Sequence, residues 1–203
     1  MTLSLPEFCK INELALTGAE LRYAPQWMPA AQADALFREL RDSIDWQTHR
    51  IRLFGRNVDS PRLSSWIGDA GSSYTYSGVR FEPQAWPTAL VAVRQHLMQT
   101  LGYEFNSVLA NLYRDGRDCM GWHADNEPEL GKQPVIASLS LGATRRFVLK
   151  AFREPSRKLE IALPHGSLLV MGGDTQQHYR HALPRTARPV AERINLTFRR
   201  IMA

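Results

Sequence analysis

The sequence predicts an α+β fold, mainly β, in which a β-sandwich or jelly roll core is flanked by N-terminal helices. Two stretches with helical periodicity lie in the first half of the chain, and from Ser107 onward short β-rich runs alternate with turn residues. Many short strands after two helices favour stacked sheets over a parallel α/β sheet. Because 203 residues with 44% hydrophobic content can bury one substantial core, we expect a single domain over residues 1–203.

The two helices are expected at residues 30–44 and 87–101. In both stretches apolar side chains recur every three or four positions, which forms one stripe along a helix. Pro29 directly precedes the first stretch, and Pro87 opens the second, where the missing backbone donor costs nothing. Gly102 can end the second helix in the left-handed conformation that other residues disfavour.

The strands are expected in the second half of the chain, which would make residues 107–203 the core and residues 1–106 a helical part that precedes it. Gly142, Ala143 and Thr144 have the character of a hairpin turn between two of these strands. The predicted strands are residues 107–113, 135–141, 146–151, 158–163, 167–171 and 193–201.

The charge of the chain fits a polyanionic partner. Its formal net charge is +5, and lysine and arginine near a phosphate backbone gain free energy from counterion release. A solvated basic face explains the same composition equally well, so the charge alone does not decide between the two interpretations.

The N-terminus, residues 1–10, has no basic start followed by a long apolar run, and no stretch reaches the roughly 18 apolar residues of a membrane helix. We therefore expect neither a secretory signal nor a membrane span. Cys9 and Cys119 are far apart in sequence and are interpreted as reduced thiols. The protein is expected to be a cytoplasmic monomer working at the nucleoid, or nuclear if its source is eukaryotic.

A candidate metal site consists of His123, Asp125 and His181. Two residues apart in an extended segment, His123 and Asp125 present their side chains on one face, and His181 follows after the next predicted strands. Two histidines and one carboxylate are the ligand set of non-haem iron(II) oxygenases, because they leave coordination positions open. A His-x-Asp pair by itself is more often a surface or capping feature, so the pair needs support from elsewhere in the chain.

The last predicted strand supplies that support, because its alternation separates polar from apolar side chains. If the polar face were solvated, this would be an ordinary edge strand. If it faces the interior, unpaired guanidinium groups would each cost several kcal/mol, so something anionic must lie there. A dicarboxylate fits, because arginine forms forked hydrogen bonds with carboxylates. The polar positions are Arg193, Asn195, Thr197 and Arg199, and Asn111 and Tyr113 on an earlier strand could add contacts.

These residues resemble the AlkB type of DNA and RNA repair dioxygenases, in particular members that act on duplex DNA. The resemblance spans roughly residues 54–201. Its motifs are NLYRDG at 111–116, HADNE at 123–127, HGSLL at 165–169, HALP at 181–184 and RINLTFR at 193–199.

The resemblance implies a double-stranded β-helix, or jelly roll, preceded by N-terminal helices and a nucleotide-recognition lid in residues 1–106. It also implies Fe(II) held by His123, Asp125 and His181, with O2 at the last open position. Decarboxylation of 2-oxoglutarate to succinate would accompany hydroxylation of an N-methyl group, which leaves as formaldehyde. The residues implied for 2-oxoglutarate are Asn111, Tyr113, Arg193, Asn195, Thr197 and Arg199.

Two segments resemble the family's substrate contacts. Phe54, Gly55 and Arg56 lie in RLFGR, which is similar to a finger that fills the gap left by a flipped base, although a turn with a packed phenylalanine has the same pattern. Tyr74, Thr75 and Tyr76 resemble the aromatic lid over that base, and a half-buried tyrosine pair is the alternative.

Asn126 and Glu127 complete the implied substrate contacts. Glu127 occupies the position of an acid that reads the base, whereas Asn126 stands where some relatives have a second acid. The implied substrates are 1-methyladenine and 3-methylcytosine in duplex or single-stranded DNA. The alternatives are an RNA or tRNA demethylase, an oxygenase acting on a protein or small molecule, and a nucleic-acid binding module without catalysis.

Overall fold

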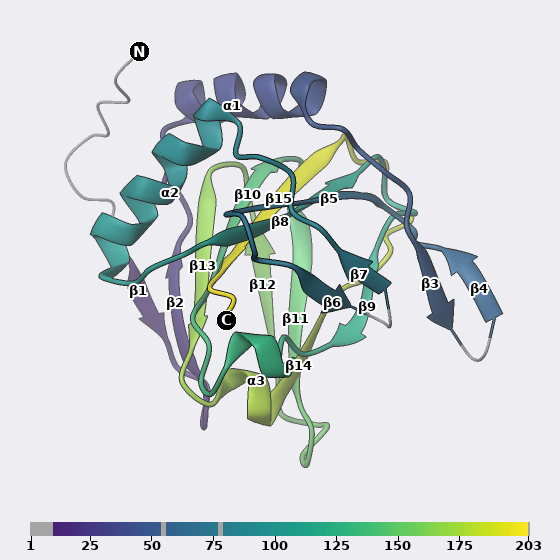
Figure 1. Cartoon of the computed structure of the whole chain (residues 1–203). Helices are drawn as coiled ribbons and strands as arrows, with labels where there is room; N and C mark the ends of the chain where they lie inside the picture. The colour runs from purple at the N-terminus through teal and green to yellow at the C-terminus, as the bar shows by residue number, and fades with distance from the viewer. Residues whose placement is uncertain (1–9, 54–55, 77–78, 203) are drawn as a thin grey trace.

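Two antiparallel sheets lie face to face and enclose the centre of the protein (Figure 1). The computed structural model describes residues 10–53, 56–76 and 79–202, and for residues 50–53, 56–57, 74–76 and 79–81 it describes the backbone alone. In spatial order the larger sheet contains β1 (Asn12–Leu14), β2 (Glu20–Ala24), β13 (Ser167–Gly172), β10 (Ile136–Gly142), β15 (Arg193–Arg199), β8 (Ser107–Tyr113) and β5 (Leu63–Gly68). The smaller sheet contains β12 (Lys158–Leu163), β11 (Arg145–Ala151), β14 (Tyr179–Leu183) and β9 (Met120–His123).

Two long helices cover the outer face of the larger sheet (Figure 1), and both confirm the sequence prediction. Helix α1 (Ala30–Ser43) follows Pro29, and α2 (Thr88–Leu101) ends at Gly102, whose φ is 64°. Their buried side chains pack with Leu139, Val170 and Leu196 of the sheet in one apolar cluster. Two short helical segments complete the fold. η1 (Pro128–Leu130) connects β9 to β10, and α3 (Thr175–His178) connects β13 to β14. No helix among the described residues has the length and apolar character of a membrane span.

A second apolar cluster fills the space between the two sheets. It joins Leu169 and Met171 of the larger sheet to Leu149 and Ile161 of the smaller one. With one core under the helices and one between the sheets, the larger sheet is buried on both faces. The arrangement is the predicted jelly roll with flanking helices, and the six predicted strands all form, with ends that differ by at most two residues from the prediction.

The larger sheet also takes strands from the first part of the chain, which the sequence analysis did not predict. β1, β2 and β5 join it, so the jelly roll begins well before residue 107. β2 reads ELRYA and β5 reads LSSWIG, and neither has a clean alternation of apolar and polar residues. In β5 the two serines are as buried as the tryptophan, because the strand is covered on both faces: Trp66 packs between the sheets and Ile67 packs in the cluster under the helices.

The predicted hairpin turn at residues 142–144 is wrong. β10 pairs with β13 and β15 in the larger sheet, whereas β11 pairs with β12 and β14 in the smaller one. Gly142, Ala143 and Thr144 therefore carry the chain from one sheet to the other. Gly142 has φ of 82°, and a side chain there would meet the backbone oxygen of Glu192. The glycine that suggested a tight turn thus permits a corner between sheets.

Two separate hairpins lie on the right-hand side of Figure 1, away from α2. β3 (Arg50–Leu53) pairs with β4 (Arg56–Asp59), and β6 (Tyr74–Tyr76) pairs with β7 (Val79–Phe81). These hairpins coincide with the predicted finger and lid. Phe54 and Gly55 lie outside the described residues.

We expect Gly142→Ala to lower stability more than Gly102→Ala. Both glycines have positive φ, which costs an L-residue about 1 to 2 kcal/mol. Only at Gly142 would the new methyl group also collide with backbone and come within 2.9 Å of Phe37, whereas nothing lies within 4 Å at Gly102. Urea unfolding midpoints of the two variants measure the difference in stability. Equal losses of stability would show that the backbone around Gly142 shifts to make room for the methyl group.

Candidate metal and co-substrate site

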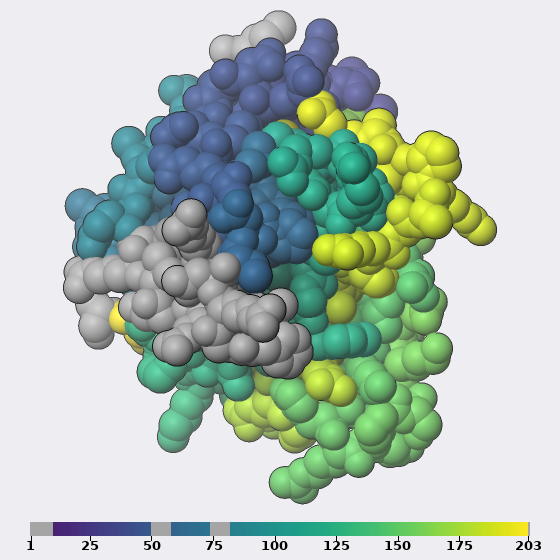
Figure 2. All heavy atoms as spheres, turned by 90° about the vertical axis from the view of Figure 1, so that its right-hand side faces the viewer, coloured from purple at the N-terminus to yellow at the C-terminus, as the bar shows by residue number. Residues whose placement is uncertain are grey.

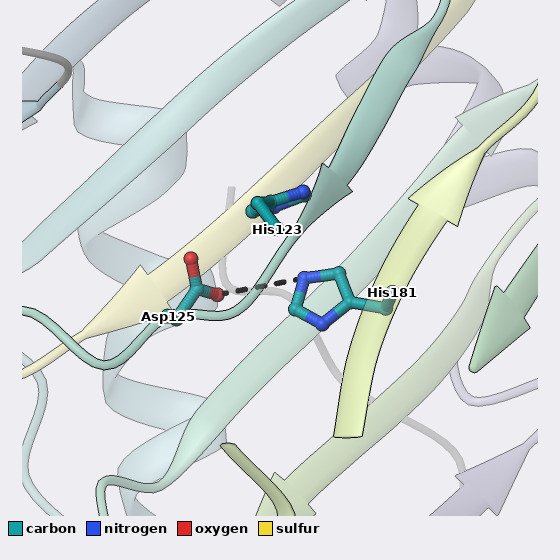
Figure 3. Close-up of side chains that lie close together, drawn as sticks. All are labelled: His123, Asp125 and His181. Carbon is teal, nitrogen blue, oxygen red and sulfur yellow. Dashed lines mark ion pairs between the residues drawn. The ribbon is translucent and has the colours of Figure 1, made fainter. Parts of the chain in front are cut away.

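His123, Asp125 and His181 meet in one place (Figure 3), which confirms the predicted convergence. One potential ligand atom from each residue lies within 4.8 Å of the others. His181 on β14 is the register partner of His123, the last residue of β9, so strand pairing brings the two imidazoles together. Asp125 follows two residues after β9 and reaches the same point from the side, with its Oδ2 4.0 Å from Nε2 of His181.

The donor atoms of this group have the character of metal ligands. Nδ1 of His123 lies 2.9 Å from the backbone oxygen of Gly121, and since a carbonyl can only accept, Nδ1 carries the proton. Nε2 of His123 therefore keeps its lone pair. Oδ2 of the buried Asp125 has no hydrogen-bond partner among the described residues. A divalent cation would satisfy this oxygen, whose burial is otherwise unfavourable.

The protonation states also suit a metal. Burial lowers the pKa of His181 to about 3 and also lowers the pKa of His123. Burial by itself would raise the pKa of Asp125, but the adjacent Arg199, together with the two histidines, brings it to about 2. At neutral pH the group is thus two neutral imidazoles and one carboxylate, which are the forms that bind a metal ion.

Two buried side chains hold Asp125 in position. Nη2 of Arg199 donates to Oδ1 of Asp125 at 2.8 Å, which leaves Oδ2 directed at the histidines. The backbone amide of Asp125 donates to Oε1 of Gln176 at 3.0 Å, and Gln176 on α3 is 1% exposed. The sequence analysis missed Gln176, because no local pattern distinguishes it from the surface glutamine beside it.

One cavity contains all nine residues predicted to bind the metal or the co-substrate. β15 and β8 are neighbours in register, with Arg193 opposite Tyr113 and Asn195 opposite Asn111, so the polar side chains of both strands share one wall. The sequence analysis missed the rest of the lining. These additional residues are Leu109, Met120, Ser138, Phe147, Met171 and Leu183.

Arg193 is a buried cation with incomplete pairing. It is 1% exposed, its Nη2 donates to Oγ of Ser140 at 2.9 Å, and its guanidinium lies 5.2 Å from the centre of the Tyr113 ring. Its Nε and Nη1 have no hydrogen-bond acceptor among the described residues. Burial lowers the pKa of Arg193 to about 10, so the group is still charged at neutral pH. A bound carboxylate would supply both the missing charge and the missing acceptors.

Comparison with known proteins decides the family. A model of the 2OG-Fe(II) oxygenase superfamily matches residues 20–199. Mouse DNA oxidative demethylase ALKBH2 is 40% identical over 182 residues, which cover 85% of this chain and 76% of the mouse protein. The chain belongs to the AlkB family of 2OG-Fe(II) oxygenases. It is therefore a dioxygenase that uses iron(II), 2-oxoglutarate and O2.

Further relatives agree with this family. The bovine alpha-ketoglutarate-dependent dioxygenase alkB homolog 3 is 36% identical over 186 residues, which cover 87% of this chain and 64% of the bovine protein. The solved structure of OsALKBH1 superposes with a TM-score of 0.64 at 17% identity and covers 94% of this chain and 100% of its own. At that identity the superposition shows the shared fold alone.

Two further buried arginines support the co-substrate wall of this AlkB-family enzyme, and the sequence analysis missed both. Nε of Arg62 donates to Oδ1 of Asn111 at 2.7 Å. Because a guanidinium only donates, Arg62 holds the side-chain oxygen of Asn111 toward itself, and the side-chain nitrogen of Asn111 points away from Arg62. Arg145 lies 5.9 Å from the Tyr113 ring and donates to three backbone carbonyls. These contacts join residues 27 or more positions apart, which local sequence patterns do not reveal.

Other polar residues of the wall bond within it. Nδ2 of Asn195 donates to Oγ of Ser138 and to the backbone oxygen of Leu139, and Thr197 donates to Oδ1 of Asn195 at 3.3 Å. The amide of Asn195 is thus oriented before any co-substrate binds. Preformed orientation lowers the entropic cost of binding.

The predicted substrate contacts are only partly described. Asn126 is exposed and Glu127 is partly buried at the start of η1, and neither lines the cavity. Arg56 begins β4, and Tyr74, Thr75 and Tyr76 form β6, with their side chains outside the description. Their roles toward a base stay predictions.

We expect His181→Ala to abolish metal binding, whereas His178→Ala retains it. His181 is one of three converging ligands, while the exposed His178 contacts the backbone oxygen of Gly18 and lies outside the cavity. Manganese at about 100 times its dissociation constant should stabilise the His178 variant by about 2.7 kcal/mol and leave the His181 variant unchanged. Thermal unfolding with and without manganese measures this, and equal stabilisation of both variants would exclude His181 as a ligand.

Proposed function

We propose that the protein removes N-linked methyl groups from 1-methyladenine and 3-methylcytosine in DNA. The observation that carries the proposal is the convergence of His123, Asp125 and His181 in the cavity that also contains the buried cation Arg193. The mouse and human proteins called DNA oxidative demethylase ALKBH2, both 40% identical over 85% of the chain, support DNA as the substrate. An RNA demethylase of the same family is the second candidate.

In this proposal His123, Asp125 and His181 would hold iron(II), and this ligand set would leave room for the co-substrate and O2. Arg199, which lies against Asp125, marks the metal end of the cavity, and Arg193, beside Tyr113, marks the far end. A diacid that spans these ends would meet Arg193 with its outer carboxylate, next to Tyr113, its register partner. The chain's own residues thus bind and orient the co-substrate.

The bound iron and 2-oxoglutarate supply the oxidation: O2 gives one oxygen atom to succinate, with loss of carbon dioxide, and one to the methyl group, which leaves as formaldehyde. No side chain needs to act as a nucleophile. Apolar residues such as Leu109, Met171 and Phe147 complete the cavity wall and exclude bulk water from the reacting atoms.

We expect Arg193→Met to weaken 2-oxoglutarate binding about 10- to 100-fold, because a charged hydrogen bond contributes about 1.5 to 3 kcal/mol. The matched control is Arg200→Met, since Arg200 follows β15, is 44% exposed and pairs with Glu104. Calorimetric titration of the manganese-loaded proteins measures both.

A 2-oxo acid without the far carboxylate separates this role from general damage. It should bind weakly and equally to the wild-type protein and to Arg193→Met. If the variant lost affinity for this monoacid as strongly as for 2-oxoglutarate, Arg193 would not recognise the far carboxylate.

Access to the substrate requires that the methylated base leave the duplex, since the residues that would hold iron line a cavity inside the jelly roll. We propose that the β3–β4 hairpin inserts Phe54 in place of the flipped base and that the β6–β7 hairpin covers the base with Tyr74 or Tyr76. The positions of both hairpins on one side of the fold support this (Figure 1). We also propose that the enzyme acts as a monomer.

The decisive assay supplies iron(II), 2-oxoglutarate and ascorbate with methylated DNA in single-stranded and duplex form, and with methylated RNA. Loss of methyl groups and formation of succinate are measured together. We expect turnover of both DNA forms, and Phe54→Ala should lower turnover of the duplex about 10-fold while single-stranded turnover changes little, because filling the gap offsets a few kcal/mol of unstacking.

Phe152→Ala is the control for this variant, since Phe152 is also a phenylalanine outside the cavity and is 46% exposed. Equal loss on single and double strands after Phe54→Ala would contradict the finger. Turnover of RNA but not DNA would establish the second candidate, and succinate without methyl loss on any nucleic acid would overturn the proposed function.

A further inference from the structure

Trp122 is an exposed indole directly beside the metal site. It is 47% exposed, whereas Trp27 and Trp66 are 5% and 3% exposed. It lies on β9, the edge strand of the smaller sheet, one residue before His123. His123 lines the cavity, whereas the ring of Trp122 lies outside that lining and contacts Lys150 and Arg180. None of the functions assigned above uses this side chain.

A row of cations lies next to Trp122 on the same face. Lys150 is the register partner of Arg180 on one side and of Lys158 on the other, so three cations stand directly opposite one another on β14, β11 and β12. The guanidinium of Arg180 lies 5.5 Å and Nζ of Lys150 6.0 Å from the centre of the Trp122 ring. We call Trp122, Arg180, Lys150 and Lys158 the tryptophan face.

This row is electrostatically unfavourable by itself, because like charges directly opposite each other destabilise a sheet. Lys158 lies 3.4 Å from Glu160, but Glu160 also pairs with Arg146 at 3.1 Å. Lys150 and Arg180 form no salt bridge with a carboxylate of the described residues. The face therefore has an excess of positive charge that an anionic partner would relieve.

The remaining outward residues of these strands do not offer an apolar surface. Val148 and Ala182 lie between the charged positions and are largely buried, and Ala162 is small. A protein partner would find one indole, the exposed Phe152 just beyond β11 and several cations. A nucleic acid would find a stacking platform for a base with a row of cations for the phosphates to one side of it, and such a combination binds single strands without sequence preference.

We propose that the tryptophan face binds a single-stranded segment of DNA that flanks the base in the active site. A base stacks on Trp122, and Lys150, Arg180 and Lys158 contact the neighbouring phosphates. Because β9 is an edge strand, a strand of DNA that crosses this edge reaches the cavity mouth next to His123. In Figure 2 the teal atoms of the chain around residue 120 lie near the green atoms of residues 145–163, which form β11 and β12. The inference rests on the proposed function.

The test measures binding of an unmethylated, fluorescein-labelled oligothymidine of about 16 nucleotides, the upper end of what such sites cover. Because this probe has no lesion, its affinity reports contacts outside the base pocket. By fluorescence anisotropy, Trp122→Ala should weaken binding about 10-fold, and Trp122→Phe should retain most of the affinity because phenylalanine also stacks. Tyr103→Ala, which removes a partly exposed aromatic ring next to α2 on the other side of the larger sheet, should bind like the wild-type protein.

The charges are tested away from the metal ligands with the double variant Lys150→Gln and Lys158→Gln. The slope of log affinity against log salt should become shallower by about 1.4, since each phosphate contact to a single strand contributes about 0.7. Arg200→Gln, which removes a charge paired with Glu104, should leave this slope unchanged.

Trp122 neighbours a metal ligand, so the visible absorption of the anaerobic complex with iron(II) and 2-oxoglutarate is recorded for each variant. With that absorption unchanged, wild-type affinity in Trp122→Ala would overturn the inference. An equal loss on a fully paired duplex would also overturn it, because paired bases cannot stack on an indole. If the wild-type protein removed no methyl group while these binding results held, the proposed function alone would fail.

Discussion

The burial of charge between the two sheets is the constraint on which the site depends. Asp125, Arg193 and Arg199 are each at most 4% exposed, and the interior cannot hold such charges without partners. Arg199 and Asp125 neutralise each other through a 2.8 Å hydrogen bond, yet Asp125 keeps one oxygen for a metal and Arg193 keeps donors for an anion. The protein is therefore built to be complete only with a cation and a carboxylate in place.

Strand register, and not loop structure, sets the geometry of this centre. The pairing of β14 with β9 brings the two histidines together, and the pairing of β15 with β8 places Arg193 against Tyr113. Since a slip of one residue would turn every side chain to the opposite face, the apolar side of β15 under the helices also fixes its polar side toward the cavity with the metal ligands. Packing of α1 and α2 outside the sheet thus contributes to catalysis inside it.

The sequence predicts those parts of the protein that follow from local pattern. The alternation in RINLTFR correctly separates the cavity face of β15 from its core face, and helical periodicity locates α1 and α2. Gln176 and Arg62 could not be predicted, because each acts through one contact with a residue about 50 positions away. Gly142 misled for a related reason: its positive φ suits a hairpin and a corner equally well, and only the pairing of β10 and β11 with other strands distinguishes the two.

Placing the metal at the edge of the smaller sheet has a consequence for substrate access. Among the described strands β9 pairs with β14 alone, so His123 lies near the rim of the jelly roll, whereas Arg193 lies deep in the larger sheet and is 1% exposed. A small diacid can fill the deep end first, and a base on a long polymer then needs to reach only the rim. The deep position of Arg193 and the rim position of His123 therefore match the order in which a co-substrate and then a nucleic acid would have to enter. The outer face of β9 could also contact the polymer without disturbing the co-substrate.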